Sequence, residues 1–219
     1  MLVVSQAIRG VRQREVRRAL VALLVATPLA LACESPTRRS GEVADLAKML
    51  SVGTGAVVAE IGAGDGSAAV AFARLVGPDG RVYANELDPR QIARIRSRAG
   101  GAVAANVVLV VGSEASANLP DACCDAIFMR GVYHHFANPD AMLASIRKAL
   151  RPGGRLAVID FPPTWWLAPW TPRGVPANRH GHGIPVSVLK TELAGAGFVP
   201  LATVDAWRQR SFCVVVRKP

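Results

Sequence analysis

The chain has 219 residues, 51% of them hydrophobic, which excludes an intrinsically disordered protein and provides for one domain with a full core. Its four cysteines, of which an odd three remain if Cys33 is lipidated, argue against a disulfide-rich scaffold. The formal charge of +10 is spread along the chain, and its one dense basic cluster lacks interleaved aromatic rings, so no nucleic-acid partner is expected; the cluster is Arg90, Arg94, Arg96 and Arg98.

Residues 1–32 are predicted to be a signal peptide or membrane-targeting leader. Five arginines and one glutamate precede an uncharged run over 19–32, which is shorter than the roughly 20 apolar residues of a membrane-spanning helix. Residues 30–33, ALAC, resemble a bacterial lipoprotein box whose cysteine, Cys33, becomes lipidated, and residues 17–18 resemble a twin-arginine signal. A retained anchor, a misassigned start and a plain amphipathic helix stay open as alternatives.

The leader sets the expected location of the protein. Processing at Cys33 predicts the cell envelope or periplasm, with a lipid anchor and membrane association through the leader, whereas a leader that is no export signal predicts the cytoplasm. Loss of its five arginines and one acid lowers the formal charge from +10 to +6. The rest of the chain, 33–219, is treated as one domain.

Helical and apolar segments alternate through this domain. Ser40 is the expected cap of a helix that ends at Leu50. Helices are then predicted over 67–76, 89–99, 139–150 and 186–196, and strands over 56–61, 82–86, 107–111, 126–129, 155–160, 198–204 and 211–217. This order predicts an α/β fold: a Rossmann-like, doubly wound seven-stranded sheet, mostly parallel, with a C-terminal antiparallel hairpin.

A glycine loop joins the first strand to the next helix. The strand AVVAEIG runs into GAGDG, which places Gly62, Gly64 and Gly66 before a helix that starts near Ser67. Glycine allows a sharp turn and the close approach of a ligand to the backbone. A dinucleotide fingerprint would need its third glycine at position 67, so the loop disfavours NAD-type cofactors. Glu86, which ends the second strand, offers two oxygens to the hydroxyls of a ribose.

With Glu60 before the glycine loop and Glu86 after the next strand, the chain resembles the class I S-adenosylmethionine-dependent methyltransferases, types 11 and 25 in particular. LPDACCDAIFMRGVYHHF resembles the fourth strand and its loop in this family, and ALRPGGRLAVIDF resembles the turn into its fifth strand. The resemblance covers roughly residues 40–219. It implies S-adenosyl-L-methionine as the cofactor and methyl transfer as the reaction.

The resemblance also implies which residues hold the methionine part of the cofactor. The loop backbone would lie against it, and the acid before the loop would lie near its amino group. These residues are Glu60, Gly62, Ala63, Gly64, Asp65 and Gly66.

The adenosine part is assigned in the same way. Glu86 would bind the ribose and Leu87 would lie against the adenine. The family often has an acid after the third strand to bind the adenine amino group; here Ser113 stands there with Glu114 next to it, so the contact stays open between them. Arg130 would line the passage from cofactor to substrate.

The four histidines fall in two short stretches, His134-His135 and RHGHGIP with His180 and His182. Both stretches follow strand ends at the edge where ligands bind in such sheets, so the pairs are placed to meet over the methyl group. His135 or His182 is the candidate general base, since imidazole accepts protons near neutral pH. Structural or substrate-lining histidines are the alternative. No metal is predicted, because no acid is spaced to complete a site.

Three tryptophans and five prolines lie in FPPTWWLAPWTPRGVP, after the fifth strand. This composition predicts an extended loop over the active-site edge. The loop is interpreted as a lid for a hydrophobic substrate, a contact with a membrane interface, or a segment that buries its own rings. Cys123 and Cys124 are expected to be buried as small apolar residues.

The sequence therefore predicts an S-adenosylmethionine-dependent methyltransferase that acts on a small-molecule or lipid-like substrate. The alternative is a non-catalytic protein that binds the same cofactor on the same fold. The acceptor is not identified, because variable loops read it.

Overall fold

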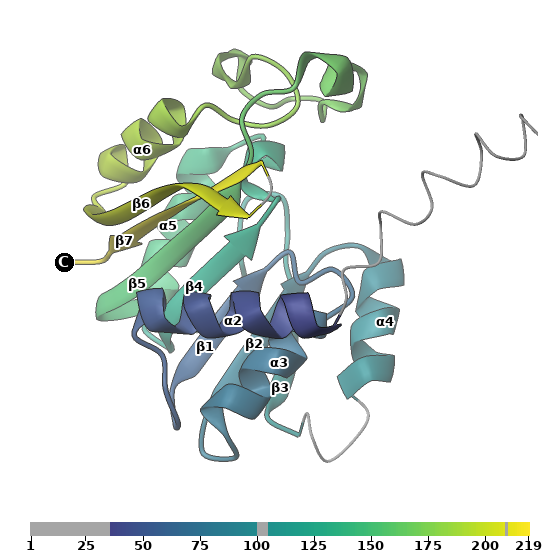
Figure 1. Ribbon diagram of the computed structural model, residues 1–219, viewed down its shortest axis with the longest axis vertical. Coiled ribbons are helices and arrows are strands. Elements are labelled where there is room, and N and C mark those ends of the chain that lie inside the picture. The colour runs from purple at the N-terminus through teal and green to yellow at the C-terminus, as the bar shows by residue number, and fades with distance from the viewer. Residues whose placement is uncertain (1–35, 100–104, 209) are drawn as a thin grey trace, which may run out of the picture. The chain divides into compact units, whose positions relative to one another are not determined.

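The computed structural model describes residues 36–99, 105–208 and 210–219 (Figure 1). The chain divides into two units after Arg39, and the second, Ser40–Pro219, holds the sheet. The predicted leader over 1–32 and the candidate lipid anchor Cys33 lie outside the described residues and stay predictions. Within the described ranges, no helix has the length and apolar character needed to span a membrane.

Seven strands of the described chain form one sheet in the order β3-β2-β1-β4-β5-β7-β6 (Figure 1). The first five pair in parallel, and β7 runs antiparallel to both β5 and β6. This confirms the predicted fold, including its antiparallel C-terminal pair. The strands are β1 (Val57–Ile61), β2 (Arg81–Glu86), β3 (Val107–Val111), β4 (Cys124–Arg130), β5 (Leu150–Asp160), β6 (Val199–Arg208) and β7 (Ser211–Arg217).

Helices cover both faces of the sheet. One core packs α2 (Pro36–Leu50), α3 (Ser67–Val76) and α4 (Pro89–Ala99) against one face, and a second core packs α5 (Pro139–Ala149) and α6 (Val186–Gly195) against the other. Neighbouring strand residues alternate between these cores, because successive side chains of a strand point to opposite faces. The central strands are therefore buried on both sides and read as continuous apolar runs.

Helix α5 shows how the local sequence sets an element. Asn138 caps it, accepting a hydrogen bond from Ala141 N at 3.0 Å, and Pro139 takes the first helical position. Its apolar face then buries Met142 and Leu143. This helix matches the predicted one except that it ends one residue earlier.

Two predicted boundaries are wrong. Helix α2 begins at Pro36, so Ser40 lies inside the helix and does not cap it; a proline suits the first position because it has no N–H to leave unpaired. Strand β5 begins at Leu150 and includes Pro152-Gly153-Gly154, which was predicted as a turn before the strand. Gly153 has φ of 77°, which is irregular for a strand, but its N–H donates to Lys218 O. This hydrogen bond to a distant residue keeps the segment within the strand.

The loop after β5 contains a short helix where an extended segment was predicted. Residues Trp165–Trp170 form the 3-10 helix η4, with hydrogen bonds from Leu167 N to Thr164 O and from Thr171 N to Ala168 O. Proline is compatible with such a short helix when its missing N–H is not one of the donors, as for Pro169 here.

The order of the strands places the ligand edge. Strand β1 has β2 on one side and β4 on the other, so the loops after β1 and β4 diverge at the carboxyl edge between them. Ligands bind at this switch point in doubly wound sheets. The glycine loop follows β1, and the first histidine pair follows β4.

Candidate active site

The glycine loop turns sharply and packs on the loop after β4. Gly62, Gly64 and Gly66 have φ values of 68°, 55° and 75°, a region that other residues rarely adopt. A Cβ built on Gly62 would come within 2.5 Å of Val132 Cγ2, whereas one on Gly64 would meet no atom within 4 Å. The loop is therefore packed at its start and open at its middle, which leaves space for a ligand at Gly64.

Glu86 brings a carboxylate onto this loop from the end of β2. Its Oε2 accepts the N–H of Gly64 at 2.8 Å, and its Oε1 accepts those of Leu87 at 2.7 Å and Asp88 at 3.0 Å. The side chain is buried, and Leu87 beside it is 58% exposed. An acid and an exposed apolar side chain thus lie together, and their contacts with a ribose and an adenine ring stay a prediction.

Asp65 and Ala63 hold the loop in place. Asp65 Oδ2 pairs with Arg98 Nη2 at 2.8 Å, and its Oδ1 accepts the N–H of Ser67 at 3.0 Å. Ala63 N donates to Asn85 O at 2.8 Å, which ties the loop to the end of β2. The Asp65 side chain thus anchors the loop to α4, and the predicted cofactor contact would involve the backbone.

The remaining predicted cofactor residues lie around this loop. Glu60 is buried within β1, one residue before the strand ends. Ser113 and Glu114 are both exposed after β3, where Ser113 Oγ accepts the N–H of Ser116 at 3.1 Å, so the choice between them for the adenine contact stays a prediction. Arg130 ends β4, and its Nη1 lies 3.4 Å from Glu42 Oε2.

Glu42 lies at the candidate site and is not among the residues predicted from the sequence. This buried acid of α2 contacts Arg130 and also accepts a hydrogen bond from Trp207 Nε1 at 2.9 Å. It therefore joins the first helix and β6 to the end of β4. The burial of Glu42 could have been predicted from the sequence, because it lies four residues before Leu46 and so shares the apolar face of the helix.

Histidines from two loops meet at the carboxyl edge. His134 and His135 belong to the 3-10 helix η3 (Tyr133–His135), and His182 comes from the segment before α6. The ring centroid of His134 lies 4.1 Å from that of His135 and 4.7 Å from that of His182. His180 is exposed in a left-handed turn with φ of 57°, so three of the four histidines form the predicted cluster.

A buried acid, Asp160, contacts the histidine cluster through His134. Asp160, at the end of β5 and 1% exposed, has its Oδ1 2.8 Å from His134 Nδ1, and its Oδ2 accepts the backbone N–H of His134 at 3.1 Å. His134 is itself 2% exposed, and its Nε2 has no hydrogen-bond partner among the described residues. The sequence does not predict this acid beside the histidines, because Asp160 lies 26 residues further along the chain than His134.

A buried ion pair fixes the loop that carries His182. Arg179, 1% exposed, donates to Glu192 of α6 at 2.6 and 3.0 Å. Tyr133 donates its hydroxyl to the same carboxylate at 2.7 Å, and burial together with the Glu192 charge raises the pKa of Tyr133. The network links the loop before α6 to the loop after β4, which positions the two groups of histidines.

The surroundings of His135 and His182 favour their neutral imidazole forms. Desolvation and, to a smaller extent, the neighbouring His134 and His182 together lower the pKa of His135 to about 4. Desolvation also lowers the pKa of His182 below its ordinary value. Both rings therefore keep a lone pair at neutral pH, which can accept a proton or bind a metal ion.

The tryptophan segment exposes its rings beside this cluster. Trp165, Trp166 and Trp170 are 80%, 49% and 67% exposed, so the interpretation that the loop buries its own rings is wrong. Thr164 N donates to His182 O at 2.9 Å, and Trp170 O lies 3.1 Å from His182 Nδ1. The backbone of the tryptophan segment thus contacts His182 at the active-site edge.

The predicted cysteine pair is only partly buried. Cys124 is buried as expected, but Cys123 is half-buried, and its Sγ lies 2.7 Å from that of Cys124. Both cysteines are free thiols at the amino end of β4, so they lie at the end of the strand opposite to the histidines.

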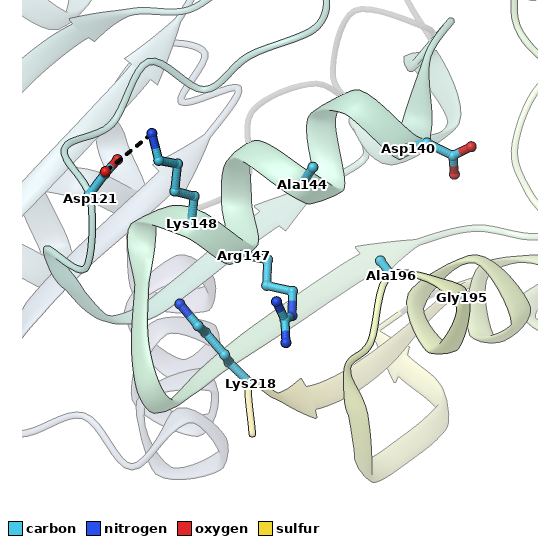
Figure 2. Close-up of a pocket in the computed structure, with 8 residues that line it drawn as sticks. All are labelled: Asp121, Asp140, Ala144, Arg147, Lys148, Gly195, Ala196 and Lys218. Carbon is cyan, nitrogen blue, oxygen red and sulfur yellow. Dashed lines mark ion pairs between the residues drawn. The ribbon is translucent and has the colours of Figure 1, made fainter.

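A groove of about 850 Å³ lies elsewhere, along α5 (Figure 2). An ion pair between Lys148 and Asp121, 3.2 Å apart, crosses one end of it. The groove includes neither the glycine loop nor the histidines, so it is not part of this site. Its lining is Asp121, Asp140, Ala144, Arg147, Lys148, Gly195, Ala196 and Lys218.

Comparison with known sequences supports the expected family. Residues 59–158 match the family model of the methyltransferase domain. The ubiquinone/menaquinone biosynthesis C-methyltransferase UbiE of Pseudomonas putida is 30% identical over 115 residues, which are 52% of this chain and 45% of that protein. The chain spans about half the length of the curated relatives it matches.

Solved structures share the fold. A SAM-dependent methyltransferase from Aquifex aeolicus has a TM-score of 0.66 at 20% identity and covers 85% of this chain and 100% of that chain. The 4+2 cyclase SpnF has a TM-score of 0.65 at 17% identity and covers 82% of this chain and 81% of that chain. Residues 59–158 thus match a methyltransferase domain in sequence, and the described sheet has the fold of S-adenosylmethionine-dependent methyltransferases; both findings support S-adenosylmethionine as the cofactor.

Proposed function

We propose that the protein transfers a methyl group from S-adenosylmethionine to a small, hydrophobic acceptor. The observation that carries this proposal is the hydrogen bond of 2.8 Å between Gly64 N and the buried carboxylate of Glu86. It puts an acid directly on an open glycine loop at the switch point of the sheet. An acid and a bare backbone at this place fit the ribose and the methionine part of the cofactor.

The cofactor supplies an electrophilic methyl group, and the residues of the chain would position the cofactor and the acceptor. The glycine loop would hold the methionine part with Glu60, while Glu86 and Leu87 would orient the adenosine. The Arg130 side chain, held near Glu42, would border the way to the acceptor. Methyl transfer is an in-line displacement, so most of its acceleration comes from such positioning.

A proton must leave many acceptors during this reaction. His135 or His182 remains our proposed general base, because both rings lie at the same edge as the glycine loop, with centroids 5.8 Å apart. If one of them is the base, its replacement by alanine lowers kcat on a given acceptor by about 100-fold or more without changing cofactor affinity.

A hydrophobic acceptor is supported by the tryptophan segment. Three exposed indole rings belong to the segment whose Thr164 and Trp170 backbones contact His182, and the Phe161 ring centroid lies 5.6 Å from that of His182. Exposed aromatic side chains beside a site favour apolar or amphipathic ligands. The curated relatives, named for ubiquinone and menaquinone biosynthesis, point to the same class of acceptor.

A second candidate is cofactor binding without methyl transfer. The fold neighbour SpnF is named as a cyclase, so this fold also serves proteins with other chemistry. The glycine loop and Glu86 would bind the cofactor equally well in such a protein.

The two candidates are separated by one set of measurements. Calorimetric titration of the full chain with S-adenosylmethionine should show binding, and titration with NAD should show none. Incubation with cofactor labelled in its methyl group and a detergent extract of lipids should then release S-adenosylhomocysteine and label an extractable product. Binding without release would support the second candidate, and no binding at all would refute both.

A further inference from the structure

We propose that His134, His135 and His182 bind one zinc ion, with Asp160 as the hydrogen-bond partner that orients His134. One nitrogen from each of the three rings lies within 4.8 Å of the other two. The site joins the 3-10 helix η3 to the loop before α6, so it brings together residues far apart in the sequence.

His134 is the fixed member of the site. Asp160 Oδ1 accepts the backbone N–H of Phe161 at 2.9 Å and lies 2.8 Å from His134 Nδ1. A carboxylate that accepts these bonds places the imidazole proton on Nδ1, so the lone pair of His134 lies on Nε2. This Nε2 is buried and has no hydrogen-bond partner in the described residues. Buried polar atoms are nearly always paired, so an orphaned lone pair beside two more imidazoles points to a bound cation.

His182 is oriented in the same way. Its Nδ1 lies 3.1 Å from Trp170 O, a carbonyl that can only accept, so the lone pair of His182 also lies on Nε2. His135, the most exposed of the three, completes the set. Zinc bonds nitrogen at about 2.0 to 2.1 Å in tetrahedral geometry, which requires nitrogens about 3.3 Å apart. Small rotations of the more accessible His135 and His182 rings would close the remaining gap.

The donor set selects the class of ion. Neutral imidazoles suit zinc and its neighbours among the transition metals, whereas magnesium and calcium prefer oxygen ligands. An acid hydrogen-bonded to the far nitrogen of a ligating histidine is the usual outer support of such sites. Packing of the three rings on one another, and of Phe161 on His134 and His182, accounts for their contacts but not for the unpaired Nε2 of His134.

Three protein ligands leave a fourth position open for water or for an oxygen of a substrate. The site lies close to the glycine loop, since Val132 contacts the Gly62 position and His134 follows two residues later. Binding of the ion rests on the histidines alone and not on the proposed methyl transfer. It excludes His135 and His182 as the general base while the ion is bound, because their lone pairs then bind the metal.

The test uses the full chain, purified without a polyhistidine tag and stripped with a chelator. Calorimetric titration with zinc should give one ion per chain, and cobalt(II) should give the visible absorption of a four-coordinate site. His135→Ala and His182→Ala should each weaken zinc binding by at least about 100-fold and abolish the cobalt spectrum. His180→Ala is the matched control, and it should bind like the wild type because His180 lies outside the cluster.

Two further variants test the thiol pair and the supporting acid. Cys123→Ser should leave zinc binding unchanged, which excludes the thiol pair as the ligand. Asp160→Asn should weaken zinc binding by about 10- to 100-fold while circular dichroism stays native. Absence of stoichiometric zinc in the wild type, or equal loss in His180→Ala and His135→Ala, would overturn the proposal. Titration of the same samples with S-adenosylmethionine reports separately on the proposed function.

Discussion

Glu86 accepts three backbone N–H groups and occupies the place of a ribose-binding acid. Glu86→Gln replaces one accepting oxygen by a donor, which opposes the Gly64 N–H and the ribose hydroxyls. Hydrogen bonds to charged groups contribute about 1.5 to 3 kcal/mol, so the affinity for S-adenosylmethionine should fall by roughly 10- to 150-fold in calorimetric titration. Asp205→Asn, an exposed acid on β6, is the control. Unchanged affinity in Glu86→Gln would remove this residue from the cofactor site.

Cys123 should be the reactive thiol of the described chain. A hydrogen bond from Cys124 lowers the pKa of Cys123, whereas burial raises the pKa of Cys213 to about 12. A lower pKa means more thiolate at a given pH, so iodoacetamide should label Cys123 at a lower pH than an ordinary thiol of pKa about 8.5. Peptide mass spectrometry across about pH 6 to 9 measures this. Cys124→Ala should move the labelling of Cys123 to higher pH; labelling of Cys213 first would contradict the assignment.

At the scale of elements, the glycine loop offers a matched pair of substitutions. Gly62 and Gly64 share a left-handed backbone, but only Gly62 has Val132 against the missing Cβ. Left-handed strain alone costs about 1 to 3 kcal/mol, so Gly64→Ala should lower the free energy of unfolding by that amount. Gly62→Ala adds a clash and should lower it further in urea denaturation. Equal losses in the two variants would show that the loops after β1 and β4 do not pack as described.

The ion pair between Arg179 and Glu192 should matter more for stability than the pairs on the surface. Glu192→Gln leaves the Arg179 charge buried without its counter-ion, which costs about 3 to 5 kcal/mol of unfolding free energy. Lys148→Ala breaks the exposed pair with Asp121 and should cost at most about 1 kcal/mol. Denaturant unfolding of both variants gives the comparison, and a loss below about 1 kcal/mol in Glu192→Gln would contradict the buried network.

Helices and strands could be predicted from the sequence where neighbouring residues alone determine them. The apolar runs at β1, β2 and β3 and the cap at Asn138 act locally, so their positions follow from neighbouring residues. The continuation of β5 through Gly153 depends on pairing with Lys218, which no local pattern reveals. The same holds for Asp160 under His134 and for Glu192 beside Arg179, because each pair joins different elements.

At the scale of the whole molecule, the predicted leader and the cofactor indicate different cellular compartments. S-adenosylmethionine is made in the cytoplasm, whereas residues 1–32 resemble an export signal. We expect the protein in the cell envelope, with a mature N-terminus at Cys33. Cell fractionation with N-terminal sequencing of the purified protein measures this, and a cytoplasmic protein that still begins at Met1 would contradict export.

The placement of β7 has a consequence for biosynthesis. This strand comes last among the described strands but lies between β5 and β6, so β6 has no neighbour in the sheet until β7 is made. Ser211–Arg217 must therefore emerge from the ribosome before β6 can join the sheet. Until then, β5 and β6 of the nascent chain have unpaired backbone edges. A transport route that accepts only folded cargo would consequently act after synthesis of this strand, when the protein can already have captured its cofactor in the cytoplasm.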